Sequence, residues 1–262
     1  MSEQTVLKFH IGIPGLVSDL LPEVAQSESM KNKKGTYFLS PRDYRNALRS
    51  WVNDKSNLNY VGAELSPEVS ALKKRLQSAD LAIASQNSML GSMEQTVSPT
   101  RTLPLAEKRI AQLSNLLPEF DLEFHVAIAS PLDVAHTLAR KGGVRNDAIE
   151  FLRSPQPWHA LIKRLVHACP DRQFFVWNLD DLLWSIPEFA CSFFDLEPDE
   201  IDADIKEIIS DAAKREYALN EMFSWEQEIP EQTVVVLRDF YTDDLQKIGV
   251  LKNVTLMPTP RA

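Results

Sequence analysis

Glycine is scarce in this sequence of 262 residues, which contains only 8 of them. Average usage of about 7% would give roughly 18 in a chain of this length. The shortage disfavours a loop that cradles phosphate groups with several glycines. Basic residues are also in the minority, since 28 Lys and Arg face 37 Asp and Glu and leave a formal net charge of −9. This balance argues against a general affinity for nucleic acid or anionic membranes, which need a basic surface.

Cysteine is equally rare, and Cys169 and Cys191 are too few to build a disulfide framework. Neither has partners at the short spacing of a metal site, so we expect two reduced thiols and no metal. No apolar stretch reaches about 18 residues, the length that spans a membrane. The N-terminus lacks the basic start and long apolar run of a signal peptide, which predicts a cytoplasmic location.

The composition is that of an ordinary globular protein, with 44% hydrophobic and 25% charged residues. Disorder requires low hydrophobicity together with high net charge, and the chain does not have this combination. The sequence contains no internal repeat, low-complexity tract or convincing linker. We therefore expect residues 1–262 to form a single domain.

Short apolar runs alternate along the chain with segments of helical periodicity. The candidate strands are residues 6–13, 36–39, 81–85, 124–130, 173–179 and 254–257. The candidate helices are residues 16–25, 41–51, 66–78, 103–117, 133–140, 157–168, 180–194, 199–223 and 231–248, whereas 27–34 and 91–101 are expected to be a surface segment and a loop. This alternation predicts an α/β fold with a mainly parallel sheet flanked by helices on both faces.

Three prolines refine the helix predictions. Ser40 and Ser66 each precede a proline at the first helical position, where the serine hydroxyl acts as an N-cap. Pro22 instead interrupts the stretch 16–25, so this helix is expected to be short, kinked or late in starting.

Ligands of such sheets bind outside the carboxyl ends of the strands. That rule nominates residues 12–18, 85–88, 129–133 and 178–181. The first three of these regions carry the segments FHIGIP (9–14), SQNSMLG (85–91) and ASP (129–131), the last followed by Thr137. The fourth region carries the segment VWNLDDL (176–182). A fifth segment, YTDDL (241–245), lies near the C-terminus.

Together these segments resemble the motifs of the bacterial sulfotransferase-like family, which has a P-loop nucleotide-binding fold. The family motifs are HIG-x-PKTGTT, S-E-N-x-x-x-G, R-D-P-x-x-x-x-x-S, V-W-R-Y-E-D and Y-x-x-D-L, in that order. The resemblance extends from about residue 7 to residue 257. It implies a P-loop NTPase or sulfotransferase-like α/β fold.

The resemblance also implies an activity, the transfer of a sulfuryl group from 3′-phosphoadenosine 5′-phosphosulfate (PAPS) to a hydroxyl or an amine. PAPS is strongly anionic, and its binding requires backbone N–H groups at a helix N-terminus together with fixed cations. The positions that match the family's donor-binding motifs are Gly12, Pro14, Gly15, Ser18, Ser130 and Thr137.

Three positions depart from the family pattern in their chemistry. Gly15 stands where the family has its loop lysine, and Ala129 stands where an arginine grips the 3′-phosphate. The carboxylate of the third strand is replaced by Gln86, whose amide cannot accept a proton near neutral pH. Asp19 adds a carboxylate where an anion should dock. Losing two charge-assisted hydrogen bonds removes about 3–6 kcal/mol, or roughly 10²–10⁴-fold in donor binding or rate.

We therefore expect a sulfotransferase-like protein that has lost PAPS-dependent transfer. It would act as a binding or accessory module for a carbohydrate-like molecule or a protein. The alternative is an active sulfotransferase, with PAPS as its cofactor, in which other cations replace the lost ones. The candidate replacements are Lys8, Arg42, Arg45, Arg140 and Lys141.

Few residues remain as catalytic candidates. Gln86 is one by position, and His10 is another because it lies beside the first turn, although alternation along its strand favours a core or rim histidine. Arg42, Arg45 and Arg49 share one helix face, which suits either a solvated surface or an anion site.

Overall fold

A parallel sheet forms the centre of the protein in the computed structural model, which describes residues 5–12, 20–49, 65–86, 89–98, 101–142, 145–179, 182–197, 200–222 and 229–257. Its six strands lie in the order β2-β3-β1-β4-β5-β6, and every neighbouring pair is parallel. The strands are β1 (Val6–His10), β2 (Thr36–Leu39), β3 (Leu81–Ser85), β4 (Asp121–Ile128), β5 (Gln173–Asn178) and β6 (Val254–Met257). The predicted α/β fold is confirmed, although β1 ends at His10 and β4 begins as early as Asp121.

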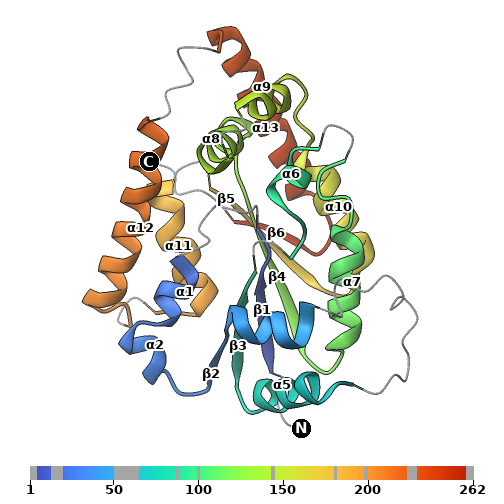
Figure 1. Ribbon diagram of the computed structural model, residues 1–262, viewed down its shortest axis with the longest axis vertical. Coiled ribbons are helices and arrows are strands. Elements are labelled where there is room, and N and C mark those ends of the chain that lie inside the picture. The colour runs from blue at the N-terminus through green and yellow to red at the C-terminus, as the bar shows by residue number, and fades with distance from the viewer. Residues whose placement is uncertain are drawn as a thin grey trace.

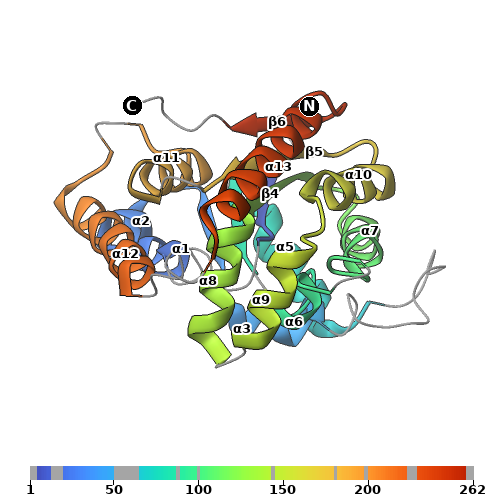
Figure 2. The same cartoon turned by 90° about the horizontal axis from the view of Figure 1, so that it is seen from above.

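Helices cover both faces of this sheet (Figure 1). On one side lie α1 (Leu20–Ala25), α2 (Glu28–Asn32), α11 (Leu182–Phe194) and α12 (Ala203–Met222). On the other side lie α5 (Pro67–Gln77), α7 (Ala106–Leu116) and α10 (Trp158–Ala168), and the view from above separates the same two groups (Figure 2). The remaining elements are α3 (Pro41–Asp43), η1 (Tyr44–Leu48), α6 (Met93–Thr96), α8 (Pro131–Gly142), α9 (Arg145–Arg153) and α13 (Glu231–Gly249).

The two faces of the sheet differ in polarity, because successive side chains of a strand point to opposite faces. Phe9, Phe124 and Phe174 are in register on β1, β4 and β5, and all three are fully buried. The opposite face carries His10 and His125 in register, and rings from α11 pack against both histidines. The centre of the sheet therefore combines an apolar face with a buried polar one.

Both predicted serine caps are confirmed. The Ser40 hydroxyl accepts a hydrogen bond from the Asp43 N–H at 3.1 Å, and the Ser66 hydroxyl accepts one from the Val69 N–H at 3.3 Å. Each cap satisfies a backbone donor that the first helical turn leaves open.

The helix after Ser40 differs from the uniform α-helix that its sequence predicts. After one α-helical turn, η1 is a π-helix in which the Arg49 N–H donates to the Tyr44 carbonyl. Such i→i+5 turns are rare and occur mostly as single turns inside α-helices. Arg45 lies within this turn and Arg49 closes it, whereas Arg42 precedes it in α3.

Several short helices also depart from the sequence predictions. Residues 27–34 include α2, whose N-cap Ser27 accepts from the Met30 N–H and whose Met30 side chain is buried. The predicted loop 91–101 includes α6. Of the predicted helix 16–25, the described part is α1, and residues 16–19 lie outside the described residues. Such one- to two-turn helices are too short to show a helical period. Across the described ranges, no helix is both long and apolar enough to traverse a lipid bilayer.

Candidate functional site

The parallel strands bring the predicted binding regions to one edge of the sheet. There β1 lies between β3 and β4, so the ends of β3 and β4 are roughly 10 Å apart, which is twice the usual strand spacing. Four residues of the predicted donor loop, Pro14, Gly15, Ser18 and Asp19, lie outside the described residues.

Gly12, the described glycine of that loop, is held by a close approach to its neighbours. A Cβ atom added at Gly12 would lie 2.7 Å from His10 Nε2 and 3.2 Å from the Ala127 Cβ. These distances are too short for any larger residue unless His10 moves. The close packing of the His10 ring therefore explains the glycine at this position without a bound phosphate.

His10 is fully buried beneath α11. Its Nδ1 lies 3.0 Å from the Ser85 Oγ, and its ring packs against Phe189 at a centroid distance of 5.2 Å. Burial, with a smaller effect of the nearby His125, lowers the pKa of His10 to about 3. The imidazole is accordingly neutral near pH 7 and shielded from solvent.

The end of β4 is closed by aromatic packing. Ala129, which the sequence resemblance aligned with a phosphate-binding arginine, is fully buried. Its carbonyl accepts a hydrogen bond from the Trp158 Nε1 at 2.9 Å, and Trp158 begins α10. The indole of Trp158, itself almost fully buried, thus binds the backbone at the place where a ligand phosphate was expected.

The hydroxyl groups that follow are engaged within their own helix. The Ser130 Oγ donates to the Asp133 carboxylate at 2.6 Å and accepts from the Asp133 N–H at 3.2 Å. Thr137 is buried, and its Oγ1 donates to the Asp133 carbonyl at 2.9 Å. Burial raises the pKa of Asp133, an effect that the Ser130 hydrogen bond opposes. This end of the sheet therefore presents a carboxyl group and hydroxyls that already have partners.

Two motif residues near the C-terminus have structural partners as well. The Asp244 carboxylate on α13 accepts hydrogen bonds from the backbone N–H groups of Trp158 at 2.6 Å and His159 at 3.1 Å. Tyr241 donates from its hydroxyl to the Asn178 side-chain oxygen at 2.8 Å, at the end of β5. Asp244 therefore caps α10 and fixes the tryptophan that closes the end of β4.

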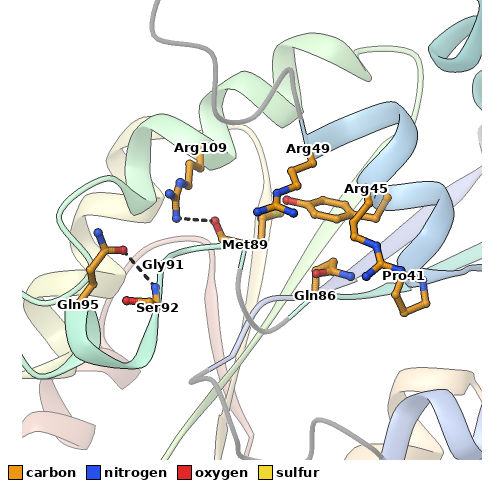
Figure 3. A pocket seen from close by; sticks show the side chains of 10 residues that line it. Pro41, Arg45, Arg49, Gln86, Met89, Gly91, Ser92, Gln95 and Arg109 are labelled. Atoms are coloured by element: carbon orange, nitrogen blue, oxygen red, sulfur yellow. Dashed lines mark hydrogen bonds between the residues drawn. The ribbon is translucent and has the colours of Figure 1, made fainter.

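The end of β3 opens instead onto a cavity of about 530 Å³. Figure 3 shows the arginines of η1 and α7 on two sides of this cavity, with Gln86 beneath them. None of the described residues that line it is an aspartate or a glutamate. They are Pro41, Tyr44, Arg45, Arg49, Gln86, Met89, Gly91, Ser92, Gln95 and Arg109.

Two of these arginines lie near the buried phenol of Tyr44. The phenol is 4% exposed, and burial raises its pKa to about 12. The positive charges of Arg109 and Arg49 act in the opposite direction, so both guanidinium groups lie within electrostatic range of the same hydroxyl. The Arg109 Nη1 also donates to the Met89 carbonyl at 3.1 Å, which orients its head toward the cavity. Partial burial lowers the pKa of Arg109, although the group stays charged.

The candidate replacement cations have different locations. Lys8 is buried, and its Nζ donates to the Asp195 carboxylate at 2.5 Å and to the Ser192 carbonyl at 3.1 Å, so it serves the sheet face under α11. Arg42 is exposed and does not line the cavity, whereas Arg45 does. The side chains of Arg140 and Lys141 lie outside the described residues.

The sequence pattern predicted one half of this cavity and missed the other. Arg45 and Arg49 were recognisable as a possible anion site from their spacing on one helix. Arg109 was not, because α7 reaches the cavity only through packing and no local motif marks the residue. Across the described ranges, no group of three or more His, Cys, Asp and Glu side chains could hold a metal ion. Cys169 and Cys191 both have free thiols.

Comparisons with known proteins do not assign the chain to a family. A scan against protein-family models finds no match, and a search of curated proteins finds no significant match. Among solved structures, the chain is similar to a sulfotransferase from Alicyclobacillus acidocaldarius, with 13% sequence identity and a TM-score of 0.38. The alignment covers 85% of this chain and 96% of that one. Its low score carries no information on activity, and the α/β assignment rests on the sheet itself.

Proposed function

We propose that the protein is a binding module with a sulfotransferase-like layout and that it does not transfer sulfuryl groups from PAPS. The observation that supports this proposal is the closed end of β4. Ala129 is fully buried there, and its carbonyl is bound by the Trp158 indole. A 3′-phosphate needs donors and a cation at this position, whereas these groups bind one another.

The neighbouring polar groups strengthen the same argument. Ser130 and Thr137, the two hydroxyls at the family's phosphate-binding positions, both donate to Asp133. A phosphate entering here would have to displace those bonds and approach a carboxylate. Removing water from a phosphate and a carboxylate that lie beside each other costs free energy. The 3′-phosphate therefore has no favourable site among the described residues of β4 and α8.

Neither of the two catalytic candidates provides an accessible base. Gln86 is an amide and cannot take a proton near neutral pH. His10 is neutral but fully buried, so an acceptor hydroxyl cannot come within hydrogen-bond distance of it without displacing α11. The expected occupant of a binding module of this kind remains a carbohydrate-like molecule or a protein.

Isothermal titration with 3′-phosphoadenosine 5′-phosphate, the product left by PAPS, tests this proposal. We expect no saturable heat, up to millimolar nucleotide, in a variant that carries both Arg45→Gln and Arg49→Gln. Micromolar binding that survives substitution of Arg45 and Arg49 would contradict the proposal, because the nucleotide would then occupy the predicted donor site.

A specific observation favours the alternative of an active enzyme. Arg45, one of the candidate replacement cations, lines the same cavity as Gln86, one strand away from the end of β1. If this arginine substituted for the lost lysine, PAPS would be converted to 3′-phosphoadenosine 5′-phosphate in the presence of hydroxyl or amine acceptors. Chromatography of the nucleotide pool after incubation with a panel of such acceptors decides between the two functions.

A further inference from the structure

We infer that the cavity between η1 and α7 is a binding site for a phosphate monoester with a small, hydroxyl-rich body. This inference goes beyond the proposed function, because the cavity can bind such an ester whether or not the donor site has been lost. It rests on the charge of the cavity, on the placement of its cations and on the polarity of its remaining lining.

The charge of the cavity is strongly positive in a chain whose net charge is −9. Three arginines line it, and its described lining contains no carboxylate. Within the described ranges, neither Arg45 nor Arg109 forms an ion pair with an acidic side chain. Like charges gathered in this way repel each other, and an entering anion relieves that repulsion.

The cations approach from two elements. Arg45 and Arg49 extend from the π-turn, and Arg109 extends from α7 and is oriented by the Met89 carbonyl. Figure 3 shows Arg49 and Arg109 directed toward the space between the two elements, and Arg45 directed toward Gln86. Guanidinium groups bind phosphate oxygens through two parallel N–H bonds, so opposed arginines can clamp a tetrahedral anion.

The charge of the ester at neutral pH distinguishes a phosphate ligand from a sulfate ligand. A phosphate monoester carries about −1.5 to −2 at pH 7, because its second pKa is near 6. A sulfate monoester carries a single negative charge under the same conditions. Three arginines without a carboxylate match the more highly charged group, so we assign phosphate rather than sulfate.

The rest of the lining suits hydroxyl groups. Gln86, Ser92 and Gln95 bring amides and a hydroxyl to the cavity, and the Gln95 Oε1 accepts from the Ser92 N–H at 3.1 Å. That bond leaves the Gln95 amide hydrogens to donate elsewhere. A volume of about 530 Å³ is within the range of small-molecule sites. Pro41 and Met89 supply the apolar contacts that a sugar-sized body also makes.

Isothermal titration with ribose 5-phosphate as the probe tests the inference, beside titrations with inorganic phosphate, inorganic sulfate and ribose. We expect saturable binding of ribose 5-phosphate that is at least tenfold tighter than that of phosphate or sulfate, and no binding of ribose. Absence of ribose 5-phosphate binding at millimolar concentration would overturn the assignment. Equal affinity for sulfate would overturn the choice of phosphate, and equal affinity for inorganic phosphate would overturn the hydroxyl-rich body.

Variants locate the binding. Arg45→Gln and Arg49→Gln should each weaken ribose 5-phosphate about tenfold to a hundredfold, as expected for one charge-assisted contact. Arg42→Gln is the matched control, since Arg42 is exposed on the same helical segment but does not line the cavity, and it should leave the affinity unchanged. Equal affinity in the wild type and both cavity variants would place the ligand elsewhere. Circular dichroism of each variant verifies that it is folded.

The outcome is separable from that of the proposed function. Nucleotide binding that persists in the Arg45→Gln and Arg49→Gln variants contradicts the proposed function and leaves this site intact. Failure of ribose 5-phosphate to bind contradicts this site and leaves the proposed loss of donor chemistry intact.

Discussion

The ends of β3 and β4 flank the same strand, yet they use their polar groups in opposite ways. At β4 the Ala129 carbonyl, two hydroxyls and Asp133 are bound to one another or to Trp158. At β3 three arginines face a cavity of about 530 Å³ whose described lining contains no carboxylate. A parallel sheet thus provides several equivalent ends, and the side chains around each end decide which of them can receive a ligand.

The closure of the β4 end is the part of this comparison with the largest energetic consequence. Ala129→Arg should lower the free energy of unfolding by about 3–5 kcal/mol, because it buries a charge without a partner. Urea unfolding measures the loss. Val236→Arg on exposed α13 is the control and should change stability by less than about 0.5 kcal/mol. A stable Ala129→Arg protein that binds 3′-phosphoadenosine 5′-phosphate would show that the β4 end is open.

Asp244 should account for the next largest effect, because it holds Trp158 in place. Asp244→Ala removes the acceptor of two backbone N–H groups and should cost about 2–3 kcal/mol of unfolding free energy. Asp244→Asn should cost less, since the amide oxygen still accepts one of these bonds. Indole fluorescence during urea unfolding measures the stability of both variants. Equal losses in the two variants would argue against a capping role.

The strand between the two ends makes stability depend on pH through His10. Its pKa is lowered to about 3 in the folded protein from 6.5, so the unfolded chain binds the proton more readily. Stability is therefore fully present above pH 6.5 and declines as the pH falls toward 3. His10 alone should remove about 2 kcal/mol between pH 7 and pH 5.

Thermal or urea unfolding at both pH values measures this loss. His10→Gln should reduce the loss of stability between pH 7 and pH 5 by the amount that His10 contributes. The contribution of His125 should remain, because burial lowers the pKa of that histidine as well. An unchanged slope in the variant would mean that His10 is accessible to protons in the folded state.

The smallest stability effect is expected at the β3 end, where the arginines serve binding rather than packing. Arg45 and Arg49 are exposed, so Arg45→Gln and Arg49→Gln should each change the unfolding free energy by less than about 0.5 kcal/mol. The same variants should weaken ribose 5-phosphate strongly. A large loss of stability instead would assign these arginines to the fold, and the contrast between the two ends would fail.

Local signals predicted the sheet well and the site only in part. Each of the six apolar runs overlaps one of the observed strands, although β4 begins at Asp121, three residues before its run. Ser40 and Ser66 cap helices as their sequence context predicted. The cavity depends on packing between distant segments, since Arg109 reaches it from α7, whereas Arg42, which precedes η1, does not line it. Asp244 likewise caps a helix 86 residues earlier in the chain, a relation that no local pattern encodes.

The comparison between the two ends is tested most directly by an NMR titration of the ¹⁵N-labelled protein with ribose 5-phosphate. The backbone amides of Arg49 and Gln86 report on the β3 end, and those of Ser130 and Asp133 report on the β4 end. The account predicts saturable shifts of the first pair and none of the second. Shifts of Ser130 and Asp133 with Arg49 and Gln86 unmoved would contradict it.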